Sequence, residues 1–219
     1  NHIAVLVGDF FVSNALAAGI RTGNIDVVSA LSALGCELSL GEIDQICNVR
    51  DHHYDEESYI SMIRQKTASL FMTCVRMGAQ VAGASAREAE PVVRFAELLG
   101  LCFQIKDDIF DYYPNPQIGK PTGNDLREGK VTLPLIHALA VAPAEESLRM
   151  KALIESGDLN QDNIQTLIDF AKCYGGIDYS FERMRSMQRE AYAVIDSCPD
   201  SESKRDFKEI FEFIISRDK

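Results

Sequence analysis

Apolar residues recur at helical spacing along nearly all of the 219 residues, and no segment shows the convincing period-two alternation of a β-strand. The longest helical pattern covers 56–83. Before it, Gly23 and Gly35 separate a largely apolar segment at 3–19 from two shorter helical patterns at 24–35 and 39–50. We expect 3–19 to be a buried helix. With 46% hydrophobic residues the chain can build one sizeable core. The pattern therefore predicts a single all-α domain.

Prolines and glycines interrupt this pattern between residues 114 and 130, and their density predicts a loop that contains no helix. Upstream, Ser85 and Glu88 have the spacing of a capping box and are expected to begin the helix that precedes the loop. Downstream, Thr132 is the expected N-cap of the next helix, with Pro134 in its first turn. Further helices are predicted near 134–142, 145–156, 161–174, 177–196 and 202–216.

The formal net charge of −11 excludes a typical nucleic-acid-binding protein, because no basic face is visible. The six cysteines are scattered without a Cys-x-x-Cys pair, and we interpret them as reduced, mostly buried thiols of a cytoplasmic protein. Because no run of 18 apolar residues occurs, we expect no transmembrane segment. The segment 3–11 is apolar from its start and lacks a convincing cap, so we expect further residues upstream of Asn1.

Three aspartates share one helical face just before the loop. Gln104, Asp107, Asp108 and Asp111 fall at positions i, i+3, i+4 and i+7, so they form one polar stripe. Close carboxylates repel one another, and a divalent cation would turn that repulsion into attraction. Oxygen ligands without a nearby His or Cys favour Mg²⁺, with Mn²⁺ as the alternative. The triplet alone leaves two interpretations open, a metal site and an acidic solvated face.

Lysines accompany the aspartates. Lys120 and Lys130 lie on the loop, where glycines allow the backbone to approach a ligand closely, and Lys66 precedes Thr67 on the long helical segment. A lysine ammonium is a point charge that suits phosphate. The alternative is an ordinary polar loop and an exposed Lys-Thr pair. However, a loop of this length in a compact domain is often a lid or a binding loop.

Together these segments resemble a known family. Residues 103–112, which read Phe-Gln-Ile-Lys-Asp-Asp-Ile-Phe-Asp-Tyr, and 119–134, which contain Gly-Lys-Pro-Thr-Gly and Glu-Gly-Lys-Val-Thr-Leu-Pro, resemble the second aspartate-rich region of trans-isoprenyl diphosphate synthases. These enzymes are also called polyprenyl synthetases. Residues 4–10, 66–71 and 214–219 resemble other segments of the same family, so the match spans the chain.

The resemblance implies a helical bundle of the isoprenoid-synthase type around a central cavity, and it also implies a function. That function is the Mg²⁺-dependent head-to-tail condensation of an allylic prenyl diphosphate with isopentenyl diphosphate by a homodimer. It implies catalytic roles for Lys66, Thr67, Gln104 and Lys120. It implies contacts to the substrate diphosphate from Lys66, Lys120 and Lys130. It implies that Asp107 holds the metal, with Asp108 and Asp111 assisting directly or through water.

The growing prenyl tail of such an enzyme needs an apolar tunnel. Candidates for its wall are Phe10, Phe11, Ala15, Leu70, Phe71 and Met77, with Phe71 near the floor. Ordinary core packing is the alternative for each of them. His137 is interpreted as a packed helix residue, because the leaving diphosphate can accept the proton and no side-chain base is required.

The chain departs from the family pattern at one point: the first aspartate-rich motif is absent and would lie upstream of Asn1. We therefore interpret residues 1–219 as a single polyprenyl synthetase domain that lacks its N-terminal helices. Two alternatives remain. One is a truncated, non-catalytic subunit or partner of such a synthase. The other is a terpene cyclase, whose metal-binding triad would begin as Asn124-Asp125-Leu126 does, but Arg127 and Glu128 break the required spacing.

Overall fold

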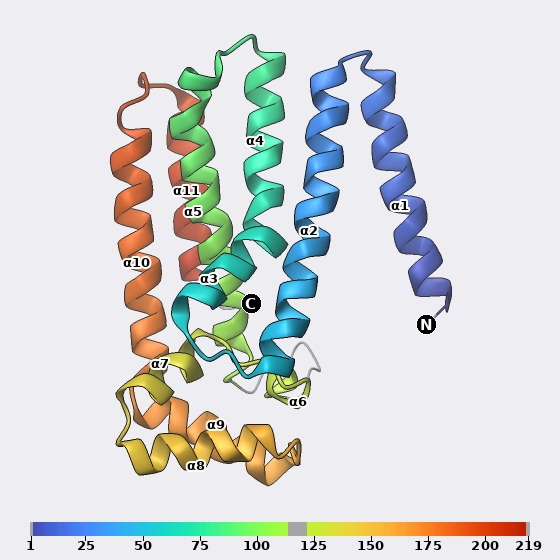
Figure 1. Cartoon of the computed structure of the whole chain (residues 1–219). Helices are drawn as coiled ribbons and strands as arrows, with labels where there is room; N and C mark the ends of the chain where they lie inside the picture. Colours follow the sequence, from blue (N-terminus) through green and yellow to red (C-terminus); the bar gives the residue numbers. More distant parts are fainter. Residues whose placement is uncertain (1, 114–121, 218–219) are drawn as a thin grey trace.

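The computed structural model describes residues 2–113 and 122–217, and over these residues it is helical without strands (Figure 1). The all-α prediction is therefore confirmed. The elements are α1 (His2–Arg21), α2 (Ile25–Asp51), α3 (Glu56–Ile63), the π-helical segment η1 (Arg64–Ala68), α4 (Ser69–Val81), α5 (Ala86–Phe110), α6 (Asn124–Arg127), α7 (Leu133–Val141), α8 (Ala144–Glu155), α9 (Gln161–Cys173), α10 (Gly176–Ile195) and α11 (Glu202–Ser216).

Helix α5 forms the centre of the bundle, and α4, α10 and α11 pack around it (Figure 1). Its capping box is confirmed: the Ser85 hydroxyl accepts from the backbone N–H of Glu88, and the Glu88 carboxylate accepts from the backbone N–H of Ser85. Most residues between Phe95 and Ile109 are buried. Helices α8 and α9 cross one end of the bundle, beneath α7. The core thus gathers around α5.

The N-terminal half differs from the sequence-based expectation in two ways. Residues 24–35 and 39–50 do not form two helices, because α2 continues through Gly35. One glycine inside a helix costs about 1 kcal/mol, which the caps and packing of a long helix can offset. Here Asn24 caps the start of α2, and His52 ends it in the left-handed conformation, with φ of 55°. The long pattern at 56–83 is one helical run, but the π-helical η1 interrupts its α-geometry.

Helix α1 is exposed, so the prediction of a buried helix at 3–19 is wrong. In this fully described helix Gly19 is the one buried residue. Figure 1 shows α1 as the outermost helix, antiparallel to α2. Its mean hydropathy of 1.9 and its length of 20 residues make it able, by length and composition alone, to cross a membrane. The expectation of no transmembrane segment stays a prediction.

The cysteines are also less buried than expected. All six are free thiols, but Cys36, Cys74 and Cys173 are exposed and Cys102 alone among the six is buried. Helix formation explains the difference, since a thiol on the outer face of a surface helix has no neighbour to cover it. The prediction of mostly buried thiols is therefore wrong.

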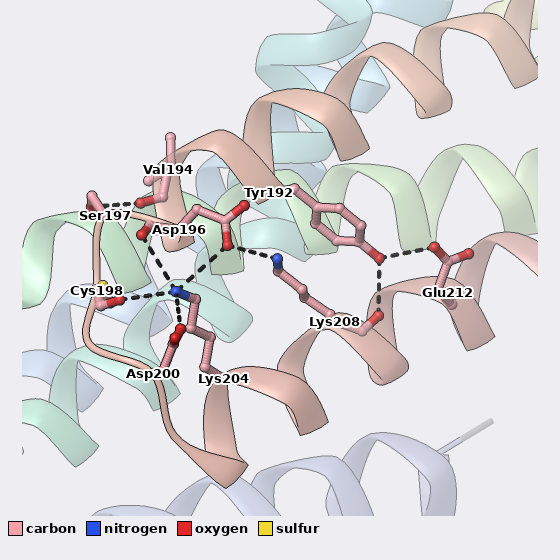
Figure 2. Close-up of polar contacts among 9 residues, drawn as sticks. All are labelled: Tyr192, Val194, Asp196, Ser197, Cys198, Asp200, Lys204, Lys208 and Glu212. Atoms are coloured by element: carbon pink, nitrogen blue, oxygen red, sulfur yellow. Dashed lines mark hydrogen bonds and ion pairs between the residues drawn. The ribbon is translucent and has the colours of Figure 1, made fainter.

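The last two helices are locked together by a polar cluster at their connection (Figure 2). Lys204 Nζ donates to the carbonyl oxygen of Cys198 at 2.9 Å and to Asp200 Oδ1 at 3.0 Å, while Lys208 Nζ pairs with Asp196 Oδ1 at 2.7 Å. The Lys204 ammonium thereby lies at the C-terminal end of α10, where a cation interacts favourably with the dipole of that helix. This cluster fixes the direction of α11, whose far end delivers Arg217 to α5.

Candidate functional site

A cavity that is partly open to solvent lies between the C-terminal half of α2, the turn after it, α3, η1, α5 and residues 125–132. Four residues proposed from the sequence line it: Lys66, Gln104, Asp108 and Lys130. They come from three separate parts of the chain, so only the tertiary fold brings them together.

Two glycines let the helices on either side approach η1 closely. A Cβ at Gly41 of α2 would lie 2.6 Å from the backbone nitrogen of Lys66, and a Cβ at Gly100 of α5 would lie 2.6 Å from the Cα of Ala68. Both distances exclude any side chain. Segment η1 is therefore clamped between α2 and α5, and the positions of Lys66 and Thr67 are set by main-chain contact. π-Helical turns of this kind are frequent at functional sites.

Lys66 enters the cavity wall beside two side chains of α2. Its Nζ lies 2.9 Å from Gln45 Oε1 and 2.7 Å from Glu42 Oε2. The cation is therefore held by one neutral acceptor and one carboxylate. Neither α2 residue was proposed from the sequence, because polar residues three apart on a helix are typical of any solvated face.

A chain of hydrogen bonds links side chains of η1, α5 and α3 at the cavity. Thr67 Oγ1 donates to Gln104 Oε1 at 2.6 Å, and Gln104 Nε2 donates to Asp108 Oδ1 at 2.8 Å. Tyr59 completes it by donating to Asp108 Oδ2 at 2.6 Å. Both oxygens of Asp108 thus accept a hydrogen bond, and its residue is only 4% exposed. Three predicted residues, Thr67, Gln104 and Asp108, form one network.

Burial raises the pKa of Asp108 to about 7, although the hydrogen bond from Tyr59 opposes the shift and the nearby Asp125 carboxylate adds to it. Burial also raises the pKa of the Tyr59 hydroxyl, with a further contribution from Asp108. The pair therefore combines a shielded carboxyl with a tyrosine that stays a donor. Such perturbed groups in a cavity are characteristic of functional sites.

Asp111 accepts hydrogen bonds from backbone N–H groups at the start of α6. Its Oδ1 accepts from the backbone N–H of Asn124 at 2.8 Å, and its Oδ2 accepts from that of Asp125 at 3.0 Å. The carboxylate thereby caps the start of α6, a short helix inside the segment that was expected to contain none, so that expectation is wrong for Asn124–Arg127. Gly123 permits the turn with φ of 75°, and a Cβ there would lie 2.3 Å from Ile164 Cγ2.

Asp107 meets the C-terminal end of α11. The Arg217 guanidinium pairs with Asp107 Oδ1 and donates to the carbonyl oxygen of Phe103 at 3.2 Å. The same guanidinium lies over the ring of Phe103, 4.4 Å from its centroid, and the Arg217 side chain is 14% exposed. A residue more than 100 positions away in the sequence therefore neutralises the first aspartate of the triplet.

Lys130 reaches the cavity after a glycine turn, with φ of 76° at Gly129. Its Nζ lies 2.6 Å from Glu128 Oε2 and 3.9 Å from Asp125 Oδ1. Burial alone would lower the pKa of Lys130, but the hydrogen bond to Glu128 and the charge of Asp125 outweigh it and raise the pKa. Lys130 therefore stays charged and, like Lys66, rests on an acidic partner.

The remaining proposed residues lie elsewhere. Lys120 falls outside the described residues. Phe10 and Phe11 are exposed on α1 with their ring centroids 6.0 Å apart, and they are not among the described residues that line the cavity. Phe71 packs on Phe103, with centroids 5.6 Å apart, at the edge of the core. Their part in a tunnel stays a prediction.

Several residues that line the cavity were not among those proposed for the synthase site from the sequence. His53 and Tyr54 lie in the turn between α2 and α3, Asn48 is on α2, and Asp125 begins the segment that ends at Thr132. Thr132 precedes α7 as expected, but its hydroxyl lies 3.2 Å from the Tyr112 hydroxyl and makes no cap hydrogen bond. Nothing in the local sequence distinguishes Asn48, His53 and Tyr54 from other polar positions at the end of a helix or in a turn.

The aspartate carboxylates fit a hard divalent cation in chemistry, because such a cation prefers oxygen ligands and a carboxylate offers about four acceptor positions. Within residues 2–113 and 122–217, however, no three His, Cys, Asp or Glu side chains are placed together as a ready metal cluster. Asp107 is the best candidate for a direct ligand, since Asp108 is enclosed by Tyr59 and Gln104.

Comparisons with known proteins agree with these features. The family model described as "Polyprenyl synthetase" matches residues 1–171. The octaprenyl diphosphate synthase of Haemophilus influenzae is 32% identical over 206 residues, which are 94% of this chain and 62% of that protein. The Escherichia coli octaprenyl diphosphate synthase is 29% identical over 220 residues, which are 100% of this chain and 68% of that protein. The chain thus spans about two thirds of the length of these relatives.

Solved structures show the same fold. The crystal structure of a geranylgeranyl pyrophosphate synthase from Bacteroides thetaiotaomicron superposes with a TM-score of 0.92 at 35% identity, covering 99% of this chain and 72% of that one. A decaprenyl diphosphate synthase from Rhodobacter capsulatus gives a TM-score of 0.90 at 28% identity, covering 100% of this chain and 68% of that one. The resemblance found in the sequence is confirmed, and the chain belongs to the polyprenyl synthetase family.

Proposed function

We propose that this protein is a prenyltransferase that condenses an allylic prenyl diphosphate with isopentenyl diphosphate to make a longer trans-polyprenyl diphosphate. The observation that carries the proposal is the cavity in which Lys66, Gln104, Asp108 and Lys130 meet. The ammonium groups of Lys66 and Lys130, which can bind a diphosphate, lie there with side-chain oxygens that can stabilise a carbocation. The names of the similar proteins, which are octaprenyl, geranylgeranyl and decaprenyl diphosphate synthases, support the same class of reaction.

The chemistry begins when the bond between the allylic carbon and the diphosphate oxygen breaks and its electron pair leaves with the diphosphate. Lys66 and Lys130, with Lys120 by resemblance, stabilise the charge that develops on this leaving group. The double bond of isopentenyl diphosphate then attacks the allylic cation. Loss of a proton to the departed diphosphate completes the product. Lone pairs of Thr67 and Gln104 face the positive charge and stabilise it.

A bound Mg²⁺, or Mn²⁺ as the alternative, would neutralise diphosphate charge as a Lewis acid. Asp107 would hold it, with Asp111 contributing through its remaining acceptor positions. Asp108 acts differently in this proposal: it fixes the orientation of Gln104 and is itself fixed by Tyr59. In the structure the Arg217 guanidinium pairs with Asp107, and a bound cation would take its place there.

We further propose that the protein works in the cytoplasm as a homodimer. Free, partly exposed thiols suit a reducing compartment. Apolar residues cover the outside of α1, among them Leu6, Phe10 and Phe11, and a patch of this kind marks an interaction surface. In the proposed homodimer, a second copy of the chain covers this apolar surface of α1. Measurement of the solution mass by light scattering tests it, and a monomer over the micromolar range would contradict it.

Asp107→Ala tests the catalytic proposal. We expect condensation to fall at least about 100-fold, because one stabilising group at the developing charge is worth 10²–10³ in rate. The assay incubates the purified protein with MgCl₂, an allylic diphosphate and isopentenyl diphosphate, and separates the products by reversed-phase chromatography. Asp206→Ala on the exposed face of α11 is the control. An unchanged circular dichroism spectrum verifies the fold, and near-normal turnover of Asp107→Ala would refute the assignment.

A further inference from the structure

On α2 a single glycine sets the position of two polar side chains. Because Gly41 has no side chain, the backbone of α2 touches the backbone of Lys66. Glu42 and Gln45 follow on the same helix and are therefore brought to the Lys66 side chain by main-chain packing. Their placement does not depend on a flexible loop.

The three side chains form a closed triangle. Lys66 Nζ contacts Glu42 Oε2 at 2.7 Å and Gln45 Oε1 at 2.9 Å, and Gln45 Nε2 lies 3.4 Å from Glu42 Oε1. Gln45 and Lys66 line the cavity, whereas Glu42 is not among the described residues that line it. Glu42 thus holds the ammonium from the rim, and Gln45 holds it from inside the cavity.

The charges near Lys66 are shared with the second lysine. Glu42 contributes to the raised pKa of Lys130, and Lys66 contributes to the lowered pKa of Glu128, after the larger effects of Lys130 on that carboxyl. Both lysines therefore lie in one electrostatic neighbourhood. Before any anion arrives, each ammonium already rests on a carboxylate that an incoming diphosphate must replace.

We propose that Glu42 and Gln45 are positioning residues for Lys66, and that Glu42 is the exchangeable counter-ion that a diphosphate displaces while Gln45 keeps the ammonium in the cavity. The inference rests on the proposed function, because it assigns Lys66 to diphosphate. Glu42 lowers the affinity for the anion in this arrangement, and in return it holds the Lys66 side chain extended before substrate binds.

Two substitutions of nearly equal shape test the proposal with opposite signs. Glu42→Gln removes the counter-ion, so inorganic pyrophosphate in the presence of MgCl₂ should bind about two- to fivefold more tightly, the range expected for a partly exposed ion pair. Gln45→Glu gives Lys66 a second carboxylate, so pyrophosphate should bind weaker by a similar factor. Isothermal titration calorimetry measures both, and Glu209→Gln on α11 controls for the change in net charge.

A double-mutant cycle separates positioning from general repulsion between charges. In a Lys66→Met background, both α2 substitutions should change the dissociation constant by less than about 1.5-fold, because the partner through which they act is gone. In the unchanged background Glu42→Gln should also lower the KM for the allylic diphosphate more than it changes kcat. A purely structural role for Glu42 would not produce a tighter-binding variant.

The outcomes separate the assignment of Lys66 to diphosphate binding from the positioning role of Glu42 and Gln45. If the unchanged protein does not bind pyrophosphate, or if Lys66→Met does not weaken binding, the assignment of Lys66 fails, and the inference about α2 fails with it. If Lys66→Met weakens binding but Glu42→Gln and Gln45→Glu match the Glu209→Gln control, only the positioning role is overturned. Equal effects of both α2 substitutions with and without Lys66 would also overturn it.

Discussion

Helices α1 and α5 are both long and carry many apolar residues, but they differ in what surrounds them. Helix α1 is almost purely apolar in sequence and is exposed along its whole length, with Gly19 as its buried residue. Helix α5 contains Arg, Glu, Lys and Asp, and nevertheless forms the centre of the core. The more polar helix is the more deeply buried one.

The burial of a helix therefore depends on complementary neighbours as well as on the hydrophobicity of its residues. Helix α5 has α4, α10, α11 and η1 around it, and its charged groups find partners there. Glu97 is an example: it pairs with Arg94 at 2.8 Å and with Arg64 at 2.5 Å. Helix α1 packs against α2 and presents its other faces outward. Burying charge is tolerable when it is paired, and apolar surface stays exposed when nothing covers it.

The largest expected effect compares the same substitution on the two helices. Ile105 is 0% exposed on α5, and Ile20 is 65% exposed on α1. Ile105→Ala should lower the free energy of unfolding by about 2–5 kcal/mol, because it removes buried methyl groups and leaves a cavity. Ile20→Ala should change it by less than about 0.5 kcal/mol. Urea denaturation at low protein concentration measures both values, and similar losses would show that α1 is as well packed as α5.

A smaller effect is expected from the buried charge on α5. Glu97→Gln should lower the free energy of unfolding at neutral pH by about 1.5–3 kcal/mol, since charged hydrogen bonds to Arg94 and Arg64 are lost. Burial alone would raise the pKa of Glu97, but the hydrogen bonds from Arg94 and Arg64 outweigh it and lower the pKa.

The sign of the pH dependence follows from that lowered pKa. The stabilisation by Glu97 is complete above its unfolded-state pKa, near 4.5, and is lost as the pH falls through the lower pKa of the folded state. The difference in unfolding free energy between Glu97→Gln and the unchanged protein should therefore shrink on acidification from pH 6 to pH 3. Denaturant titrations across that range measure it, and a constant difference would mean that the ion pairs contribute nothing.

The smallest effect on folding is expected on the exposed face of α1. Phe10→Glu combined with Phe11→Glu should leave the free energy of unfolding of the monomer within about 0.5 kcal/mol, because both rings are already exposed. The same variant should lose self-association, since charged groups would be buried without partners at the dimer interface. Sedimentation velocity separates dimer from monomer. An exposed-site control is Glu209→Gln, and a fully dimeric double variant would place the interface elsewhere.

Much of the fold could be predicted because its signals are local. The capping residues Ser85 and Glu88, and the helices that follow Thr132, lie within one or two residues of their expected places. The helix boundaries that were predicted wrongly depend on contacts between residues far apart in the sequence. Gly35 does not break α2, because the long packed helix tolerates it. The π-helical turn at Arg64–Ala68 is set by close approach of α2 and α5 at Gly41 and Gly100.

The candidate site divides in the same way. Lys66, Gln104, Asp108 and Lys130 could be proposed from motifs, and all of them line one cavity. Glu42 and Gln45 could not, because a polar pair on a helix has no distinguishing local pattern. The roles of the three aspartates also differ in ways that their spacing does not reveal. Asp107 pairs with Arg217. Asp108 accepts hydrogen bonds from Gln104 and Tyr59, and Asp111 caps α6.

The all-α class, most helix boundaries, the family and the residues of its aspartate-rich region can be predicted from the amino-acid order alone, because periodicity, caps and motifs act over a few neighbouring positions. Which apolar helix lies inside, and which side chains surround Lys66 and the aspartates, became visible in the folded molecule. Both depend on contacts between residues far apart in the chain. Those contacts follow from the packing of whole helices, and no short segment encodes them.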